Sequence, residues 1–250
     1  MAATGQEKVR TGFGPMLEKF AYAIFNDIDS VKAVLDDQTA AIMVEVVQGE
    51  GGVNPVDQSF LDDIVQLCKA NDVLLIIDEI QTGIGRTGRK FGYEHYGIEP
   101  DIFTLAKGLG NGVPVGAMVA KQALGEYFGP GTHGSTFGGN PIAMAAAKAV
   151  TSVVFADAFL LEVEEKSAYL ADLLEEHIAP ISKVKAIRQK GLMVGIEYDE
   201  AVVSLVTTLI DKGMLTLSAG ENVLRLLPPL TVTKAELDQG VQLIKETMKL

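Results

Sequence analysis

The feature that most constrains this chain is the alternation, from residue 39 onward, of short apolar runs with longer amphipathic segments. The runs over 40–47 and 73–78 are almost continuous in apolar residues, which is typical of strands that are buried on both faces. The segment between them begins after Asp57, a residue type that often caps helices, and repeats apolar residues at helical spacing to about Asn71. Strands that alternate with helices predict a parallel sheet covered by helices.

The remaining patterns complete a two-part architecture. Two more strands, over 101–106 and 115–120, extend the predicted sheet, and a glycine-rich loop covers 121–140. Pro141 opens an alanine-rich helix to about Phe155, since proline is tolerated in a first helical turn. Beyond it we expect helices over 159–177, 200–212 and 234–248 and strands over 184–187, 193–198 and 223–226, the last helix opening with a Thr233–Glu236 capping box. We place a domain boundary between 150 and 160, which divides the chain into a larger α/β domain, 1–155, and a smaller C-terminal α+β domain, 156–250.

Composition excludes several classes of partner. The chain has 33 acidic and 21 basic residues, a formal net charge of −12, so it lacks the basic field that nucleic acid or an anionic membrane attracts. Its single cysteine, Cys68, can form no disulfide within the chain and has no partner at zinc-site spacing. The first residues do not resemble a signal sequence, and no apolar run approaches the roughly 20 residues of a membrane span. We expect a cytoplasmic protein without a structural metal.

Two residues at predicted strand ends could carry chemistry. Asp78 follows the run over 73–77, and open α/β sheets bind ligands at the carboxyl ends of their strands; alternatively, Asp78 and Glu79 only cap the next segment. Lys107 follows the strand over 101–106, where burial would lower the pKa of its amine and favour attack on an aldehyde; alternatively, the side chain extends into solvent past the glycines that follow. An aspartate and a lysine at the ends of two strands of one sheet suit pyridoxal phosphate.

Three long strings support this interpretation, because in this order they resemble the class III pyridoxal-phosphate aminotransferases: Leu75–Gly88, Pro100–Gly112 and His133–Pro141. The strings Tyr93–Pro100, Pro130–His133 and Ser218–Pro229 resemble the branch whose members use N2-acetylornithine. The resemblance implies fold type I, with a mostly parallel sheet and flanking helices. It also implies transfer of an amino group from N2-acetylornithine to 2-oxoglutarate, which yields N-acetylglutamate 5-semialdehyde and glutamate. Succinylornithine and ornithine aminotransferases are the nearest alternatives.

The same resemblance implies roles for the cofactor residues. Lys107 would form the Schiff base with the cofactor and then move the substrate proton, and Asp78 would pair with the pyridinium nitrogen. Gln81 would bond near the cofactor's 3′ oxygen, unless it is an ordinary loop glutamine. Ser135 and Thr136 would bind the phosphate in the neighbouring subunit's site, which implies a homodimer; the alternative is a polar turn.

Substrate recognition is also implied by resemblance. Glu50 and Arg225 match a paired glutamate and arginine, in which the arginine holds a substrate carboxylate and the glutamate masks it while the longer amino donor is bound. Without the family, a salt bridge at a strand edge would be the simpler interpretation of Arg225. Glu45 matches a further glutamate near the cofactor, although Val46 stands where many members of the class have proline.

Some expected parts cannot be matched to this chain. Members of the class carry, ahead of the region seen here, a phosphate-binding glycine loop, an aromatic residue stacked on the pyridine ring and a further substrate arginine. We therefore expect an amino-terminally truncated or split protein, and the rival hypothesis is a catalytically incomplete subunit that needs an amino-terminal partner. A dinucleotide-binding protein is a weaker alternative, because Gly108–Gly112 lacks the G-x-G-x-x-G spacing.

Overall fold

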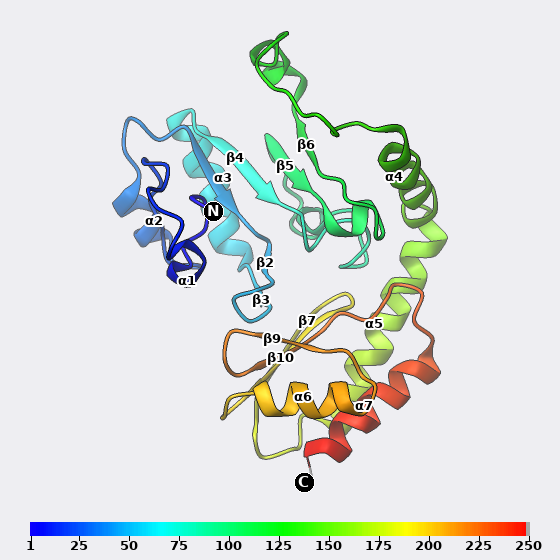
Figure 1. Ribbon diagram of the computed structural model, residues 1–250. Coiled ribbons are helices and arrows are strands. Elements are labelled where there is room, and N and C mark those ends of the chain that lie inside the picture. Colours follow the sequence, from blue (N-terminus) through cyan, green and yellow to red (C-terminus); the bar gives the residue numbers. More distant parts are fainter. Residues whose placement is uncertain (249–250) are drawn as a thin grey trace.

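Two four-stranded sheets organise the chain, one built before residue 121 and one after residue 183 (Figure 1). The computed structural model describes residues 1–248. The first sheet has the strand order β1-β4-β5-β6 and the second the order β7-β8-β10-β9. The first sheet positions most of the residues that the sequence singled out, and the second positions Arg225.

The first sheet is mostly parallel. Strands β1 (Ala41–Val44), β4 (Leu74–Asp78) and β5 (Ile102–Leu105) run in parallel, and β6 (Ala117–Ala120) is antiparallel to β5. Helix α3 (Gln58–Asn71) packs on this sheet through Phe60, Leu61 and Ile64, which share a buried cluster with Leu75 and Ile77. The expected layer of helix on parallel sheet is therefore confirmed.

The apolar run over 40–47 does not form one strand. It leaves the sheet after Val44, and β2 (Val47–Gln48) instead pairs with β3 (Asn54–Pro55) in a small antiparallel hairpin. Val47 and Val53 are buried there against Met193 of the second sheet. The prediction of a single strand was wrong because part of this apolar run packs against the second sheet and not within the first.

The second sheet is antiparallel and holds the larger core. Its strands are β7 (Val184–Lys190), β8 (Met193–Tyr198), β9 (Leu217–Ala219) and β10 (Val223–Leu226). Helices α5 (Asp157–His177), α6 (Val203–Asp211) and α7 (Lys234–Met248) contribute side chains to one cluster with β8 and β10. This cluster includes Leu174, Ile196 and Leu224, which are almost completely buried.

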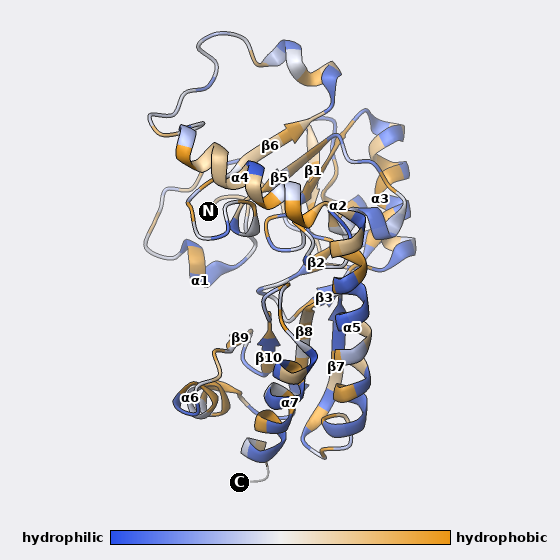
Figure 2. Cartoon of the chain, turned by 90° about the vertical axis from the view of Figure 1, so that its right-hand side faces the viewer, coloured by the Kyte–Doolittle hydropathy of each residue, from blue (hydrophilic) through white to orange (hydrophobic). Residues whose placement is uncertain are grey.

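Helix α4 (Pro141–Val154) leads from the loop after β6 into α5. Pro141 opens it as expected, and the side chain of Asn140 caps it by accepting a hydrogen bond from the Ala143 N–H at 3.0 Å. Much of α4 is apolar (Figure 2). Ile142 and Val153 on this helix are exposed. Within residues 1–248 no single helix is long and apolar enough to cross a bilayer; α4 and α5 reach that length and apolarity only together, across a bend of 69°.

The remaining elements are short. They are α1 (Glu7–Arg10), α2 (Ile28–Val34) and the 3-10 helices η1 (Gly92–Tyr96), η2 (Lys107–Leu109) and η3 (Gln122–Tyr127). The sequence patterns did not predict α1, α2 or the short strand β9. The expected domain boundary falls at the junction of α4 and α5, and the division into 1–155 and 156–250 stays a prediction.

Candidate active site

Asp78 is the last residue of β4, at the carboxyl end of a strand with neighbours on both sides. It lies opposite Thr104 of β5 in the strand register. Its Oδ1 atom accepts hydrogen bonds from Thr104 Oγ1 at 3.1 Å and from the Ile80 N–H at 2.9 Å. Asp78 thus does cap the following turn, and the bond from Thr104 also fixes its carboxylate at the edge of the sheet where ligands bind in open α/β folds.

Lys107 begins η2, two residues after the end of β5. Its backbone is left-handed, with φ of 41°, a conformation that costs a non-glycine residue about 1–2 kcal/mol. Such strain is found mostly where the surrounding structure and function require it. The expectation that the amine is desolvated was wrong, because the strand's burial ends at Leu105 and the Lys107 side chain is exposed among the glycines that follow.

Glu79, which the sequence suggested only as a possible cap, fixes the segment after β4. Its side chain is 1% exposed and accepts hydrogen bonds from Thr82 Oγ1 at 2.6 Å, from the Gly92 N–H at 2.9 Å and from the Tyr93 N–H at 2.8 Å. Burial raises the pKa of this carboxyl, although the three hydrogen bonds oppose the shift. Glu79 therefore caps η1, well beyond the turn that follows it in sequence, and holds the connection that carries Gln81.

Arg225 meets Glu50 and Gln81 where the two sheets approach each other. Arg225 Nη1 donates hydrogen bonds to Glu50 Oε1 at 2.7 Å, to the Gly49 carbonyl oxygen at 3.0 Å and to Gln81 Oε1 at 3.3 Å. The Arg225 side chain is 5% exposed and that of Glu50 is 55% exposed. The interpretation of Arg225 as a strand-edge residue was wrong, because β10 lies between β8 and β9 inside its sheet.

The carboxylates near Lys107 differ in their environment. Partial burial acts to raise the pKa of Glu50, but the hydrogen bond and charge of Arg225 outweigh it and lower that pKa, with help from Lys107. Burial raises the pKa of Glu45, and the charges of Asp78 and Glu50 add to this, against a bond from the Gly49 N–H at 3.3 Å and the charge of Lys107. The pKa values of the two glutamates are therefore shifted in opposite directions within one site.

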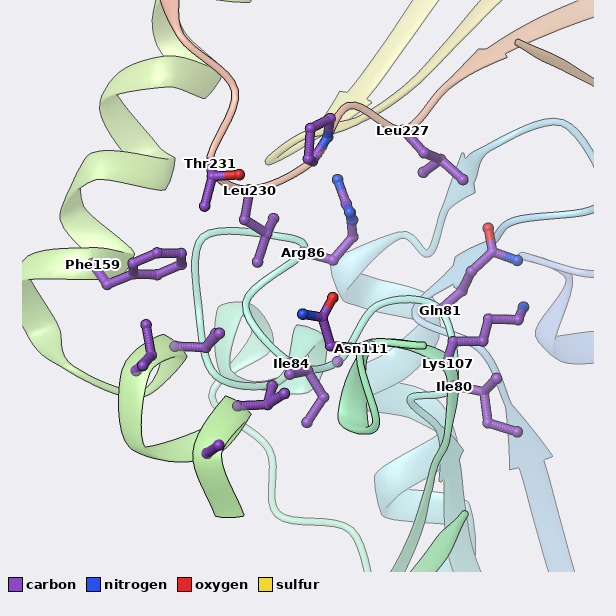
Figure 3. Close-up of a pocket in the computed structure, with 17 residues that line it drawn as sticks. Ile80, Gln81, Ile84, Arg86, Lys107, Asn111, Phe159, Leu227, Leu230 and Thr231 are labelled. Carbon is purple, nitrogen blue, oxygen red and sulfur yellow. The ribbon is translucent and has the colours of Figure 1, made fainter. Parts of the chain in front are cut away.

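A cavity of about 570 Å³ adjoins these residues (Figure 3). Lys107 and Gln81 lie at one side of the cavity, and Arg86, Asn111 and Phe159 are among the residues that line the rest. Glu45, Glu50, Asp78 and Arg225 are not among its lining residues. Sequence reasoning missed Arg86, whose Nη1 donates to the carbonyl oxygens of Leu192 at 3.0 Å and Pro228 at 2.6 Å. Burial lowers its pKa to about 10. Its position in the string Leu75–Gly88 was the only signal in the sequence.

Ser135 and Thr136 lie apart from this cluster. The segment between β6 and α4 extends away from the first sheet (Figure 1), and both side chains are exposed. Ser135 Oγ accepts a hydrogen bond from the Gly138 N–H at 3.0 Å, as in a polar turn. Within residues 1–248 the structure thus brings together Glu45, Glu50, Asp78, Gln81, Lys107 and Arg225, and leaves this loop free of them.

Comparison with known proteins identifies the class to which this fold and site belong. The chain belongs to the aminotransferase class-III family, whose family model matches residues 1–248. Among curated proteins it is similar to acetylornithine aminotransferase from Listeria innocua, with 53% identity over 249 residues that cover 100% of this chain and 65% of that protein. The same enzyme from Bacillus subtilis is 54% identical over 250 residues, covering 99% and 64%. The chain thus spans about two thirds of the length of these relatives.

Solved structures agree with this assignment. The ornithine aminotransferase of Toxoplasma gondii superimposes with a TM-score of 0.92 at 33% identity, covering 99% of this chain and 60% of that one. The N-acetylornithine aminotransferase of Stenotrophomonas maltophilia gives 0.83 at 33% identity, covering 92% and 62%. The expected class, fold type I of the pyridoxal-phosphate enzymes, is therefore confirmed.

Pyridoxal phosphate is the cofactor of this family, and a crystal structure of the Toxoplasma gondii enzyme shows it at partial occupancy in the active site. The residues present in this chain fit such a group. Asp78 supplies a half-buried carboxylate fixed by Thr104, which suits a protonated ring nitrogen. Lys107 supplies an accessible amine at the end of the neighbouring strand, held there in a strained backbone conformation.

Proposed function

We propose that the protein containing this sequence is a pyridoxal-phosphate aminotransferase that transfers an amino group from N2-acetylornithine to 2-oxoglutarate. The observation that carries the reaction class is the placement of Lys107 and Asp78 at the carboxyl ends of the adjacent parallel strands β5 and β4. The 51–55% identity with curated acetylornithine aminotransferases supports the substrate. Ornithine aminotransferase activity is the second candidate, because the Toxoplasma gondii enzyme superimposes with a TM-score of 0.92 at 33% identity.

When bound, pyridoxal phosphate supplies an aldehyde that bonds to amino groups and a ring that accepts the electron pair left by a departing proton. Lys107 would hold the aldehyde between turnovers, and its freed amine would move the proton at the reacting carbon. Asp78 would keep the ring nitrogen protonated, because its carboxylate is fixed by Thr104 and the Ile80 N–H. Gln81 would bond near the 3′ oxygen.

Arg225 would bind a carboxylate of the substrate. Arginine suits this task because its planar guanidinium can grip both carboxylate oxygens, and Arg225 is held inside its sheet. Glu50 would occupy Arg225 when the amino donor is bound and leave it when the dicarboxylate arrives. Its greater exposure supports this motion, because solvent can take up the displaced carboxylate. Glu45 would lie beside the cofactor as a further substrate contact.

We also propose a homodimer in which Ser135 and Thr136 bind the cofactor phosphate of the partner subunit. The exposed position of this loop supports the proposal, since these hydroxyls have no bond to the Lys107 cluster within residues 1–248. The single unpaired cysteine supports a cytoplasmic location.

The visible absorption spectrum of the purified chain after incubation with pyridoxal phosphate tests the proposal. We expect a band that borohydride reduction fixes to the peptide containing Lys107, that Lys107→Ala abolishes, and that Lys69→Ala, on the exposed surface of α3, leaves unchanged. N2-acetylornithine should then remove the band more effectively than ornithine or N2-succinylornithine.

A band that persists in Lys107→Ala would refute the role of Lys107. If ornithine removes the band most effectively, the substrate is ornithine and not N2-acetylornithine, and the reaction class stands. No band in any variant would favour the rival hypothesis, in which this chain is a catalytically incomplete part that needs an amino-terminal partner.

A further inference from the structure

The hydrogen bonds of Gln81 assign it a role beyond the cofactor contact proposed above. Its carboxamide is bonded at both ends: Oε1 accepts from Arg225 Nη1 at 3.3 Å, and Nε2 donates to Glu50 Oε1 at 3.2 Å. Because Arg225 Nη1 also donates to Glu50 Oε1 at 2.7 Å, the three side chains form a closed triangle. Gln81 is therefore bonded to the arginine and also to the carboxylate that the arginine holds.

The absence of a side chain at Gly49 leaves room for this carboxamide. A Cβ atom at Gly49 would lie 2.2 Å from Gln81 Oε1 and 2.5 Å from Nε2, so no other residue fits without moving the amide. Gly49 is not among the residues with positive φ, so space and not backbone conformation requires glycine here. The Gly49 carbonyl oxygen accepts from Arg225 at 3.0 Å. Gly49 and Gln81 thus both accept hydrogen bonds from Arg225 Nη1, and Gly49 leaves the space that the Gln81 carboxamide occupies.

Glu50 is the member of the triangle that can leave. Its side chain is 55% exposed, whereas Arg225 is 5% exposed. Arg225 Nε is buried and has no hydrogen-bond partner within the part of the chain that the structure describes. The guanidinium therefore still has an unused donor when Glu50 is bound.

We propose that Gln81 is a positioning residue for carboxylates: its oxygen holds Arg225, and its nitrogen donates to whichever carboxylate occupies Arg225. In one state that carboxylate belongs to Glu50, and in the other it belongs to a five-carbon dicarboxylate such as 2-oxoglutarate. This inference rests on the proposed function, because it takes Arg225 as the carboxylate site. It adds a recognition contact that a ligand without a carboxylate at this position cannot use.

Calorimetric titration with glutarate, an unreactive five-carbon dicarboxylate, tests the inference in the 250-residue chain. Glu50→Gln removes the competing charge and should tighten glutarate binding. In the Glu50→Gln background, Gln81→Ala should weaken binding by about tenfold, since a hydrogen bond to a charged group has a net value of at least about 1.5 kcal/mol. When Glu50 is present, Gln81→Ala should weaken glutarate binding less, because it also weakens the binding of the competing Glu50 carboxylate to Arg225.

If Gln81→Ala only disturbed the structure, it would weaken glutarate binding equally with Glu50 and with Glu50→Gln. A larger effect in Glu50→Gln therefore indicates recognition of the carboxylate. Gly49→Ala keeps the Gln81 carboxamide but displaces it. If Gln81→Ala folds poorly, Gly49→Ala should weaken glutarate binding in its place, again more strongly in the Glu50→Gln background. Gln66→Ala, exposed on α3, is the matched control and should change nothing. Equal effects of Gln81→Ala in the two backgrounds, with Glu50→Gln still tightening binding, would overturn the inference and leave the proposed function standing. Absence of glutarate binding even in Glu50→Gln would overturn the carboxylate site of Arg225, and the inference with it.

Discussion

Gly191 should be the most sensitive turn position of the second sheet. It joins β7 to β8 with φ of +61°, and a Cβ atom there would lie 2.4 Å from the Cα and carbonyl carbon of Thr87 and 2.6 Å from the Arg86 oxygen. Gly220 joins β9 to β10 with φ of +68° and has nothing within 4 Å of the same position. The two glycines thus share a positive φ and differ in their surroundings.

The expected magnitudes follow from this pair. Gly220→Ala carries only the left-handed backbone cost of about 1–2 kcal/mol. Gly191→Ala adds an overpacking cost of about 1–3 kcal/mol, because its neighbours are backbone atoms that cannot rotate away. The Leu192 N–H also bonds to the Arg86 oxygen at 3.0 Å, so the clash falls on the contact between the β7–β8 turn and the segment that follows β4.

Urea unfolding followed by circular dichroism measures both variants. We expect the free energy of unfolding to fall by about 2–5 kcal/mol in Gly191→Ala and by about 1–2 kcal/mol in Gly220→Ala. Equal losses in the two variants would refute the steric argument and would mean that the β7–β8 turn is not seated on Thr87 as the structure has it.

Three further predictions concern buried or paired groups. Glu79→Gln should lower the free energy of unfolding by about 1–3 kcal/mol, because an amide would oppose one of the three donors; exposed Glu126→Gln is the control, and equal urea midpoints would contradict the role of Glu79. The pKa of Glu50 is lowered in the folded chain, so the ionised carboxylate stabilises the fold at neutral pH, and this contribution is lost as the pH falls through the ordinary and then the lowered pKa. The difference in free energy of unfolding between wild type and Glu50→Gln, measured in urea, should therefore shrink on acidification. A difference that stays constant with pH would argue against the pairing of Glu50 with Arg225. Burial raises the pKa of Cys68 to about 11, so a thiol reagent at mildly alkaline pH should label it only in denaturant, and rapid labelling of the native chain would show that Cys68 is accessible.

Local signals predicted the elements that depend on local interactions. The bounds of β8, β10 and α7 agree with the sequence patterns, and the capping box of α7 forms, with Glu236 accepting from the Thr233 N–H at 2.8 Å. Strand β9 escaped prediction because it has three residues and pairs with β10 alone at the edge of its sheet. Apolar content alone could not show that Val47 turns away to pack against Met193.

The side-chain contacts of the site could be predicted less well from sequence patterns. The contact of Glu50 with Arg225 joins residues 175 positions apart, and only resemblance to the family brought them together beforehand. Resemblance could not show that Gln81 bonds to both, or that Gly49 is needed for space. Such contacts depend on how the two sheets approach each other, which no periodicity in the sequence encodes.

The left-handed backbone of Lys107 makes stability and chemistry compete at one position. At φ of 41° a glycine is the least strained residue, so a screen of variants that selects only for resistance to heat should favour Lys107→Gly. Selection for turnover should restore lysine under the role proposed for its amine. Engineering of this chain for thermal stability should therefore keep Lys107 and change other positions, since a lysine at position 107 makes the fold less stable than a glycine there would.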